Sequence, residues 1–273
     1  MLRLKDRERI VFAGDSVTDA GRAYPVGDGP NGLGSGFVRA IDTMLNAFYP
    51  QFMFDIINAG INGNTTRDLL ARWDRDVIAL KPDRLVICIG INDVWRQFDY
   101  PCNPDRHVLP EEYEANMRKL IESAKESVPE ILLLTPYYME PNAADTMRAR
   151  MDEYGAIVKR LAKEYSLPCI DLQPVFSEYL ANRHSAYLMW DRVHPGPIGS
   201  MLIAGKILKE FGFDKNITEE FCSDPRIGSH TNALGVFKMR SGKFPRRFVS
   251  RLAYQTKPSY ESREAQMSLP ALP

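Results

Sequence analysis

Apolar residues follow two alternating patterns along the chain, short continuous runs and longer helical repeats. The short runs are bounded by Gly, Pro or Asp, which is typical of buried strands; they span 10–13, 54–58, 85–89, 131–135 and 169–172. Between them, apolar residues recur at the three- and four-residue spacing of an amphipathic helix over 69–78, 113–124 and 147–161. A last repeat over 203–211 stops before Gly212, a residue type that commonly ends helices.

The alternation of strand and helix over residues 1–213 predicts the fold class. Parallel strands need long crossover connections, and helices usually supply these while covering both faces of the sheet. We therefore expect a three-layer α/β/α, flavodoxin-like sandwich with a five-stranded parallel sheet. Residues 214–273 lack a long apolar period and contain several prolines and serines. They are expected to form a C-terminal extension, irregular or packed against another subunit.

Charge and composition narrow the classes of partner. The chain has 35 Lys+Arg and 35 Asp+Glu, so no net field attracts nucleic acid or an anionic membrane. Aromatic and basic residues do interleave over 237–254, as nucleic-acid binding would require. Because the whole chain is neutral, we favour a solvated or subunit-packing extension over a nucleic-acid site.

The ends and the cysteines indicate the cellular setting. The N-terminus is charged from Arg3 onward, and no stretch approaches eighteen consecutive apolar residues, so a cytoplasmic protein is expected. The cysteines form no C-x-x-C pair and are predicted to be buried reduced thiols rather than disulfides or a zinc site; they are Cys88, Cys102, Cys169 and Cys222.

The triplet Gly14-Asp15-Ser16 directly follows the first predicted strand. A serine there stands at the carboxyl edge of the sheet, where ligands bind in open α/β folds. By itself the triplet is weak evidence, because such turns are common and a serine often caps a helix. Ser16 is nevertheless a candidate nucleophile.

A second motif, Asp191-Arg-Val-His194-Pro195, precedes the last predicted helix. An acid three residues ahead of a histidine can turn both side chains the same way, so that the imidazole accepts a serine proton while the carboxylate holds its other nitrogen. Alone, the acid would be a helix cap and the histidine a loop residue, which is our interpretation of His107, His184 and His230. Together with Ser16 they predict a catalytic triad.

The loops after the second and third predicted strands reach the same edge as Ser16. A tetrahedral oxyanion needs fixed hydrogen-bond donors, and a glycine N–H or an asparagine amide can supply them. Gly63 and Asn92 are the candidates, with the N–H of Ser16 as a third donor. The alternative is turn chemistry, because Gly and Asn readily adopt left-handed conformations.

Other motifs near these residues carry less information. Residues 27–32 spell G-x-G-x-x-G but follow no strand, so a loop beside the active site is expected rather than a nucleotide site. The G-x-S-x-G elbow is missing around Ser16, because Thr18 occupies the last glycine position. Trp95 and Trp190 adjoin the motifs and are candidate sugar contacts, although tryptophan is also often buried in a core.

The four blocks, Gly14-Asp15-Ser16, Gly63, Gly90 to Asp93 and Asp191 to His194, resemble the SGNH (GDSL-type) hydrolase superfamily in order and placement, over roughly residues 9–213. Val17 stands where the namesake motif has leucine. The resemblance implies a flavodoxin-like domain, a triad of Ser16, Asp191 and His194, and an oxyanion hole of Ser16, Gly63 and Asn92. The stretches around Asn92 and His194 are similar to those of intracellular acetylxylan esterases, which deacetylate xylo-oligosaccharides.

These patterns predict a serine esterase for short acyl groups. The expected substrate is a small acetylated carbohydrate or another short-chain ester, cleaved through an acyl-enzyme on Ser16 without metal or cofactor. No nucleic acid or membrane is expected as a partner, and a homo-oligomer is an open expectation. A lipase, lysophospholipase or thioesterase of the same superfamily is the nearer alternative. A non-catalytic ligand-binding protein is the alternative from another class.

Overall fold

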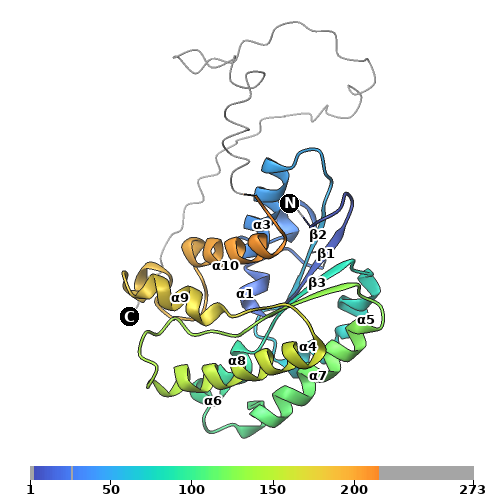
Figure 1. Cartoon of the computed structure of the whole chain (residues 1–273). Helices are drawn as coiled ribbons and strands as arrows, with labels where there is room; N and C mark the ends of the chain where they lie inside the picture. The colour runs from blue at the N-terminus through green and yellow to red at the C-terminus, as the bar shows by residue number, and fades with distance from the viewer. Residues whose placement is uncertain (1–2, 26, 215–273) are drawn as a thin grey trace, which may run out of the picture. The chain divides into compact units, whose positions relative to one another are not determined.

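The five apolar runs form the strands of one sheet, as predicted (Figure 1). The computed structural model describes residues 3–25 and 27–214. All neighbouring strands are parallel, in the order β2-β1-β3-β4-β5. The strands are β1 (Arg9–Gly14), β2 (Asp55–Gly60), β3 (Arg84–Cys88), β4 (Glu130–Leu134) and β5 (Cys169–Ile170).

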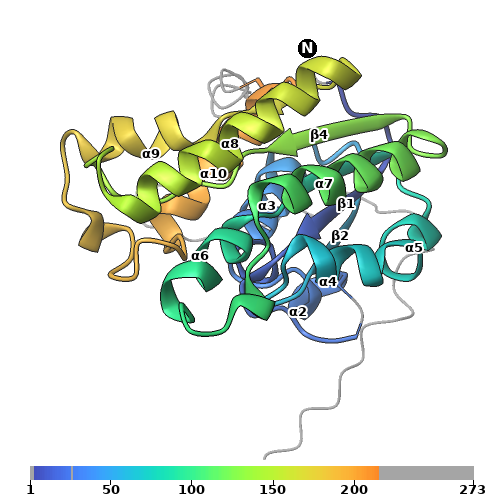
Figure 2. The same cartoon turned by 90° about the horizontal axis from the view of Figure 1, so that it is seen from below.

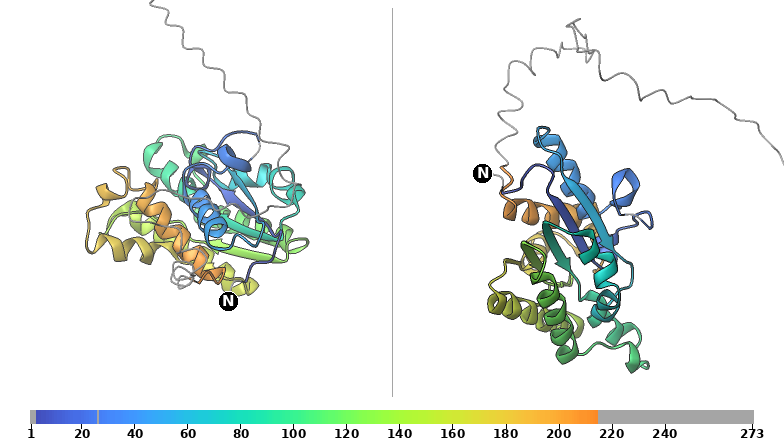
Figure 3. Two further views of the ribbon diagram at one scale, coloured as in Figure 1. Left: turned by 90° about the horizontal axis from the view of Figure 1, so that it is seen from above. Right: turned by 90° about the vertical axis from the view of Figure 1, so that its right-hand side faces the viewer.

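Helices cover both faces of this sheet and confirm the predicted three layers. Helices α3 (Phe37–Phe48) and α10 (Pro197–Glu210) pack together on one face, with α9 (Leu172–Leu180) beside α10 (Figures 1 and 3). The other face carries α4 (Thr66–Ala71), α7 (Pro110–Lys125) and α8 (Thr146–Tyr165), which lie in front of the strands in Figure 2. The shorter helices are α1 (Ser16–Asp19), α2 (Gly29–Gly32), α5 (Trp73–Asp76) and α6 (Ile91–Asp99), with 3-10 turns η1 (Ile78–Leu80), η2 (Pro104–Arg106) and η3 (Ser185–Tyr187).

The central strands are buried on both faces, because helices cover them from each side. In β1, every residue from Ile10 to Gly14 is buried, and in β3 every residue from Leu85 to Cys88. A parallel strand covered on both faces carries a continuous apolar run instead of an alternating pattern. This is why the sequence pattern identified both strands.

The strand order brings three loops together at the carboxyl edge. The chain leaves β1 for β2 on one side and later returns to β3 on the other side. Gly14 pairs in register with Gly60 on β2 and with Cys88 on β3, so the loops after these residues begin side by side. Such a reversal of strand order creates the crevice in which open α/β folds bind ligands.

Several predicted elements differ from the observed ones. Strand β5 is short because Asp171 caps α9 through a bond from the Gln173 N–H, which places Leu172 in the helix. The repeat over 69–78 breaks into α4, α5 and η1 around Arg72, whose backbone angles are not helical. Gly29–Gly32 is one helical turn rather than a loop. Helix α3 was not predicted, although its buried face follows the helical period.

The predicted helix end at Gly212 is confirmed by its φ of +75°. The predicted extension lies outside the described residues except for Asp214. No helix in the described part is both long and apolar enough to cross a bilayer.

The cysteine prediction holds only in part. The three cysteines of the described region are free, and Cys88 is buried. Cys102 is exposed, so the prediction of a buried thiol is wrong there, because it lies in the loop between α6 and η2. Cys222 lies outside the described residues.

Candidate active site

Ser16 occupies the first position of α1, directly after β1. Asp15, not Ser16, caps this helix: its Oδ1 accepts from the Val17 N–H at 2.9 Å. No side chain fits at Gly14 before this helix, because a Cβ there would lie 2.2 Å from the Cys88 carbonyl oxygen of β3. Because Asp15 supplies the cap, the Ser16 hydroxyl is not needed for that role. It lies 2.9 Å from Nε2 of His194.

Asp191 and His194 meet within one loop, as their spacing predicted. Nδ1 of His194 lies 2.7 Å from Oδ2 of Asp191. Oδ1 of Asp191 accepts from the N–H groups of Val193 and His194, at 2.9 and 3.0 Å. Asp191 does not cap α10, which begins after Gly196. One carboxylate thus orients both the loop backbone and the imidazole.

The segment after β4 holds this loop in place through two hydrogen bonds. Arg192 adopts a left-handed φ of +61°, and its carbonyl accepts from the Met139 N–H at 2.9 Å. The buried Tyr137 hydroxyl donates to the Val193 carbonyl at 3.0 Å. Both contacts come from the segment that follows β4, so the sheet positions the loop that carries His194.

The two candidate oxyanion residues lie in the segments that follow β2 and β3. Gly63 follows β2 and has a φ of +79°, a region that favours glycine. Asn92 lies in the first turn of α6 and is 2% exposed. Its Nδ2 donates to the Asn64 carbonyl at 3.0 Å, while Oδ1 accepts from Arg96 at 2.8 Å. An amide nitrogen carries two hydrogens, so one remains for an oxyanion.

Arg72 lies behind the nucleophile and links these loops, and the sequence analysis missed it. Its guanidinium donates to the carbonyls of Gly14 and Ala59, at 3.0 and 2.9 Å. Its Nε donates to Oδ1 of Asn64 at 2.7 Å. The signal was present in the sequence: Arg72 lies three residues after Leu69, on the apolar face of the helical repeat. A charged residue on such a face indicates a buried polar partner.

Two buried acids adjoin the nucleophile and Asn92. Asp15 is 1% exposed and Asp93 is 0% exposed, and burial raises the pKa of each to about 7. Asp93 accepts from the Thr66 N–H at 3.1 Å, which ties α6 to α4. The charge of Asp93 further raises the pKa of Asp15. Two carboxyl groups with raised pKa values therefore lie beside the nucleophile and Asn92.

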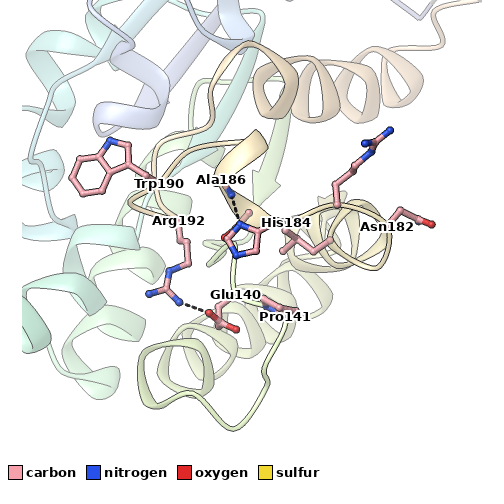
Figure 4. A pocket seen from close by; sticks show the side chains of 10 residues that line it. Glu140, Pro141, Asn182, His184, Ala186, Trp190 and Arg192 are labelled. Atoms are coloured by element: carbon pink, nitrogen blue, oxygen red, sulfur yellow. Dashed lines mark hydrogen bonds and ion pairs between the residues drawn. The ribbon is translucent and has the colours of Figure 1, made fainter.

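The two predicted substrate contacts lie in different surroundings. The half-buried Trp95 ring is 5.8 Å from the His194 ring, edge to face. Trp190 is 82% exposed and lines a cavity of about 750 Å³ with Arg192 and Glu140, which form an ion pair (Figure 4). No triad or oxyanion residue lines that cavity. Contact of either indole with substrate stays a prediction.

Two of the other histidines, His107 and His184, lie outside regular helices and strands, as expected. His107 Nε2 is 2.9 Å from the Tyr100 carbonyl, and His184 Nδ1 accepts from the Ala186 N–H at 3.1 Å. His230 lies outside the described residues. Over residues 3–25 and 27–214, no three His, Cys, Asp or Glu side chains are grouped to hold a metal ion.

The chain is similar to several known proteins. Residues 12–202 match the GDSL-like Lipase/Acylhydrolase family. An acetylxylan esterase from Geobacillus stearothermophilus is 47% identical over 78% of this chain and 98% of its own. The crystal structure of Axe2, an acetylxylan esterase from that organism, has a TM-score of 0.76 at 47% identity and the same coverage.

A second solved structure and variants of the first extend the comparison. LAE5, an alpha/beta hydrolase enzyme from the metagenome of Lake Arreo, has a TM-score of 0.76 at 45% identity, covering 78% of this chain and 99% of its own. Three Axe2 structures are described as catalytic mutants, in which a serine, a histidine or an aspartate is replaced by alanine.

Proposed function

Because the chain belongs to the GDSL-like lipase/acylhydrolase family and is a carboxylic ester hydrolase, we propose that it deacetylates xylo-oligosaccharides through an acyl-enzyme on Ser16. The observation that carries the proposal is the hydrogen-bonded line from Ser16 Oγ through the His194 ring to Asp191, at 2.9 and 2.7 Å. The same three residue types are those replaced in the catalytic mutants of Axe2.

In the proposed reaction, Oγ of Ser16 attacks the acetyl carbonyl while Nε2 of His194 accepts its proton. Asp191 stabilises the imidazolium through Nδ1. The tetrahedral oxyanion is held by the N–H groups of Ser16 and Gly63 and by the free amide hydrogen of Asn92. The sugar hydroxyl leaves with the proton from His194. Water then attacks the acyl-enzyme by the same route and releases acetate.

The acetylated sugar is favoured over the alternatives on specific grounds. The relative that is 47% identical is an acetylxylan esterase. The nearer alternative, a lipase, lysophospholipase or thioesterase, would require an apolar channel for the acyl chain. The other alternative, a ligand-binding protein without catalysis, would not need a serine aligned with a histidine and an acid.

Further features of the proposal rest on sequence. We propose that the enzyme acts in the cytoplasm, without metal, cofactor, nucleic acid or membrane as a partner. The neutral formal charge supports the absence of nucleic acid and membrane, and a hydrolytic mechanism that uses only groups of the protein supports the absence of metal and cofactor. A homo-oligomer also belongs to the proposal, and light scattering on the full chain would measure it.

The test compares Ser16→Ala with the wild type on p-nitrophenyl acetate and on acetylated xylo-oligosaccharides. We expect kcat to fall by roughly 10⁵- to 10⁶-fold at an unchanged melting temperature. The matched control is Ser127→Ala, an exposed serine between α7 and β4, which should keep full activity. Full activity of Ser16→Ala would overturn the mechanism, and preference for long acyl chains would overturn the acetyl assignment.

A further inference from the structure

A polar cavity of about 400 Å³ opens beside the proposed oxyanion hole. Gly63 forms part of its wall, and the other lining residues are Thr65, Arg67, Asp68, Arg96, Asp105 and Arg106. Arg96 also donates to Oδ1 of Asn92 at 2.8 Å. The cavity therefore adjoins two of the three proposed oxyanion donors, and a group bound in it would lie next to the reacting carbonyl.

The lining is unsuited to an acyl chain. Apart from Gly63 and Thr65, every lining residue has a charged side chain. A long acyl chain placed there would displace water from these charged groups, which is unfavourable. Hydroxyl groups, in contrast, can both donate to carboxylates and accept from guanidinium groups.

The charges of the lining nearly cancel within the cavity. Arg67 forms an ion pair with Glu112, and Arg96 forms one with Asp99. Asp105 and Arg106 differ from them, since their side chains make no hydrogen bond or ion pair with any described residue. Arg106 lies over the Tyr100 ring, 4.5 Å from its centre. A carboxylate and a guanidinium that lack hydrogen-bond partners among the described residues suit a neutral ligand with many hydroxyls better than an anion.

The walls of this cavity are held in place before any ligand binds. Arg67 donates to the carbonyls of Asp105 and His107, at 2.7 and 2.9 Å, which fixes η2 against α4. Asp68 accepts from the Thr65 N–H at 2.8 Å and so closes the start of α4. Preorganised walls reduce the entropy lost when a ligand binds.

The larger cavity near Trp190 is the competing location. Arg192 is already paired with Glu140 there (Figure 4), and the Asn182 amide donates to the Glu178 carbonyl at 3.3 Å. None of the proposed triad or oxyanion residues lines it. Volume alone would favour this cavity, whereas the smaller one shares a wall with the oxyanion hole.

We propose that the cavity between α4, α6 and η2 binds the saccharide part of the ester, with Asp105 and Arg106 as hydrogen-bond partners of its hydroxyls. This inference rests on the proposed function, since it places the alcohol portion of the same substrate. The acetyl group would then lie beside Ser16 and the oxyanion donors. Binding of the sugar in the cavity would determine which esters are preferred. Hydrolysis of a substrate without a sugar should then not depend on either side chain.

The test uses Asp105→Ala and Arg106→Ala in the full-length chain. For acetylated xylo-oligosaccharides we expect KM to rise about 10-fold with each substitution, because a charged hydrogen bond is lost, while kcat changes little. For p-nitrophenyl acetate, kcat and KM should both stay at wild-type values. Arg183→Ala in the larger cavity is the matched control and should leave all four parameters unchanged.

Wild-type KM for the oligosaccharide in both Asp105→Ala and Arg106→Ala would overturn the saccharide site, and so would a KM increase confined to Arg183→Ala. In either case the proposed function survives if Ser16→Ala abolishes acetate release. Failure of the wild type to release acetate from any acetylated oligosaccharide would instead overturn the proposed substrate.

Discussion

The two halves of the candidate site are built in different ways. Asp191 and His194 belong to one loop, and the carboxylate binds the backbone of the same segment that carries the imidazole. Ser16, Gly63 and Asn92 come from the segments that follow three different strands, and these segments meet because β2 and β3 lie on either side of β1. The acid–base half is therefore largely local, whereas the oxyanion half depends on tertiary contacts.

Buried polar groups perform different tasks in the two halves. In the acid–base half, the buried Tyr137 hydroxyl donates to the Val193 carbonyl and makes no hydrogen bond with the side chains of Asp191 or His194. Behind the oxyanion half, Arg72 bonds to the ends of two strands and to the loop of Gly63. Substitutions in the first half should therefore affect proton transfer, and those in the second should affect oxyanion stabilisation.

The largest effect in this comparison is expected from Asp191→Asn. An amide cannot hold the same imidazole tautomer, so kcat should fall roughly 10⁴-fold, the scale known for serine proteases. Steady-state hydrolysis of p-nitrophenyl acetate measures it, with an unchanged melting temperature as the check on folding. A loss below 10-fold would show that the local half needs no carboxylate.

Asn92→Ala tests the oxyanion half directly. Loss of one donor should lower kcat by about 10²- to 10³-fold with little change in KM. The matched control is Asn46→Ala on the exposed side of α3, which should behave as the wild type. Equal activity of the two variants would remove Asn92 from the oxyanion hole.

Arg72→Ala tests whether the buried network positions the oxyanion half. We expect kcat to fall about 10-fold or more at constant KM, and the free energy of unfolding to fall by about 2 kcal/mol, because buried carbonyls lose their donor. Arg72→Lys should recover part of kcat, since one ammonium can still reach one carbonyl. The nearby exposed Arg75→Ala is the control, and a folded Arg72→Ala protein with wild-type kcat would refute the positioning role.

The smallest effect on activity is expected from Asp15→Asn, which should instead change the pH dependence of stability. The folded protein holds the Asp15 proton up to a pKa of about 7, whereas the ordinary value is 3.8. Protons bound only in the folded state make stability fall as pH rises between these values, by at most about 1.4 kcal/mol per pH unit for each group.

Asparagine does not titrate, so Asp15→Asn should make this decline shallower and leave the contribution of Asp93, whose pKa is also raised to about 7. Urea unfolding of wild type and variant at pH 5, 6, 7 and 8 measures the slopes. A wild-type stability that increases from pH 5 to pH 7 would contradict the burial argument.

Local patterns in the sequence were enough to predict the strands, the layered fold and the catalytic motifs. Continuous apolar runs identified all five strands, and the alternation with helical repeats predicted the layered fold, because both depend on short-range periodicity. The pairing of Asp191 with His194 was also readable, since three residues of spacing suffice to bring them together. The family and the class of ester hydrolase followed from four ordered motifs and are confirmed.

Only the tertiary structure decided how these parts meet. The strand order makes the segments of Ser16, Gly63 and Asn92 neighbours at the carboxyl edge, and no local period encodes that order. Arg72 bonds to residues of β1, β2 and the loop after β2, and the polar cavity beside Gly63 is also lined by separate segments. Contacts between residues far apart in the sequence depend on how the helices and strands pack. The chain therefore encodes its chemistry in short motifs, while the distances between those motifs are set by the sheet.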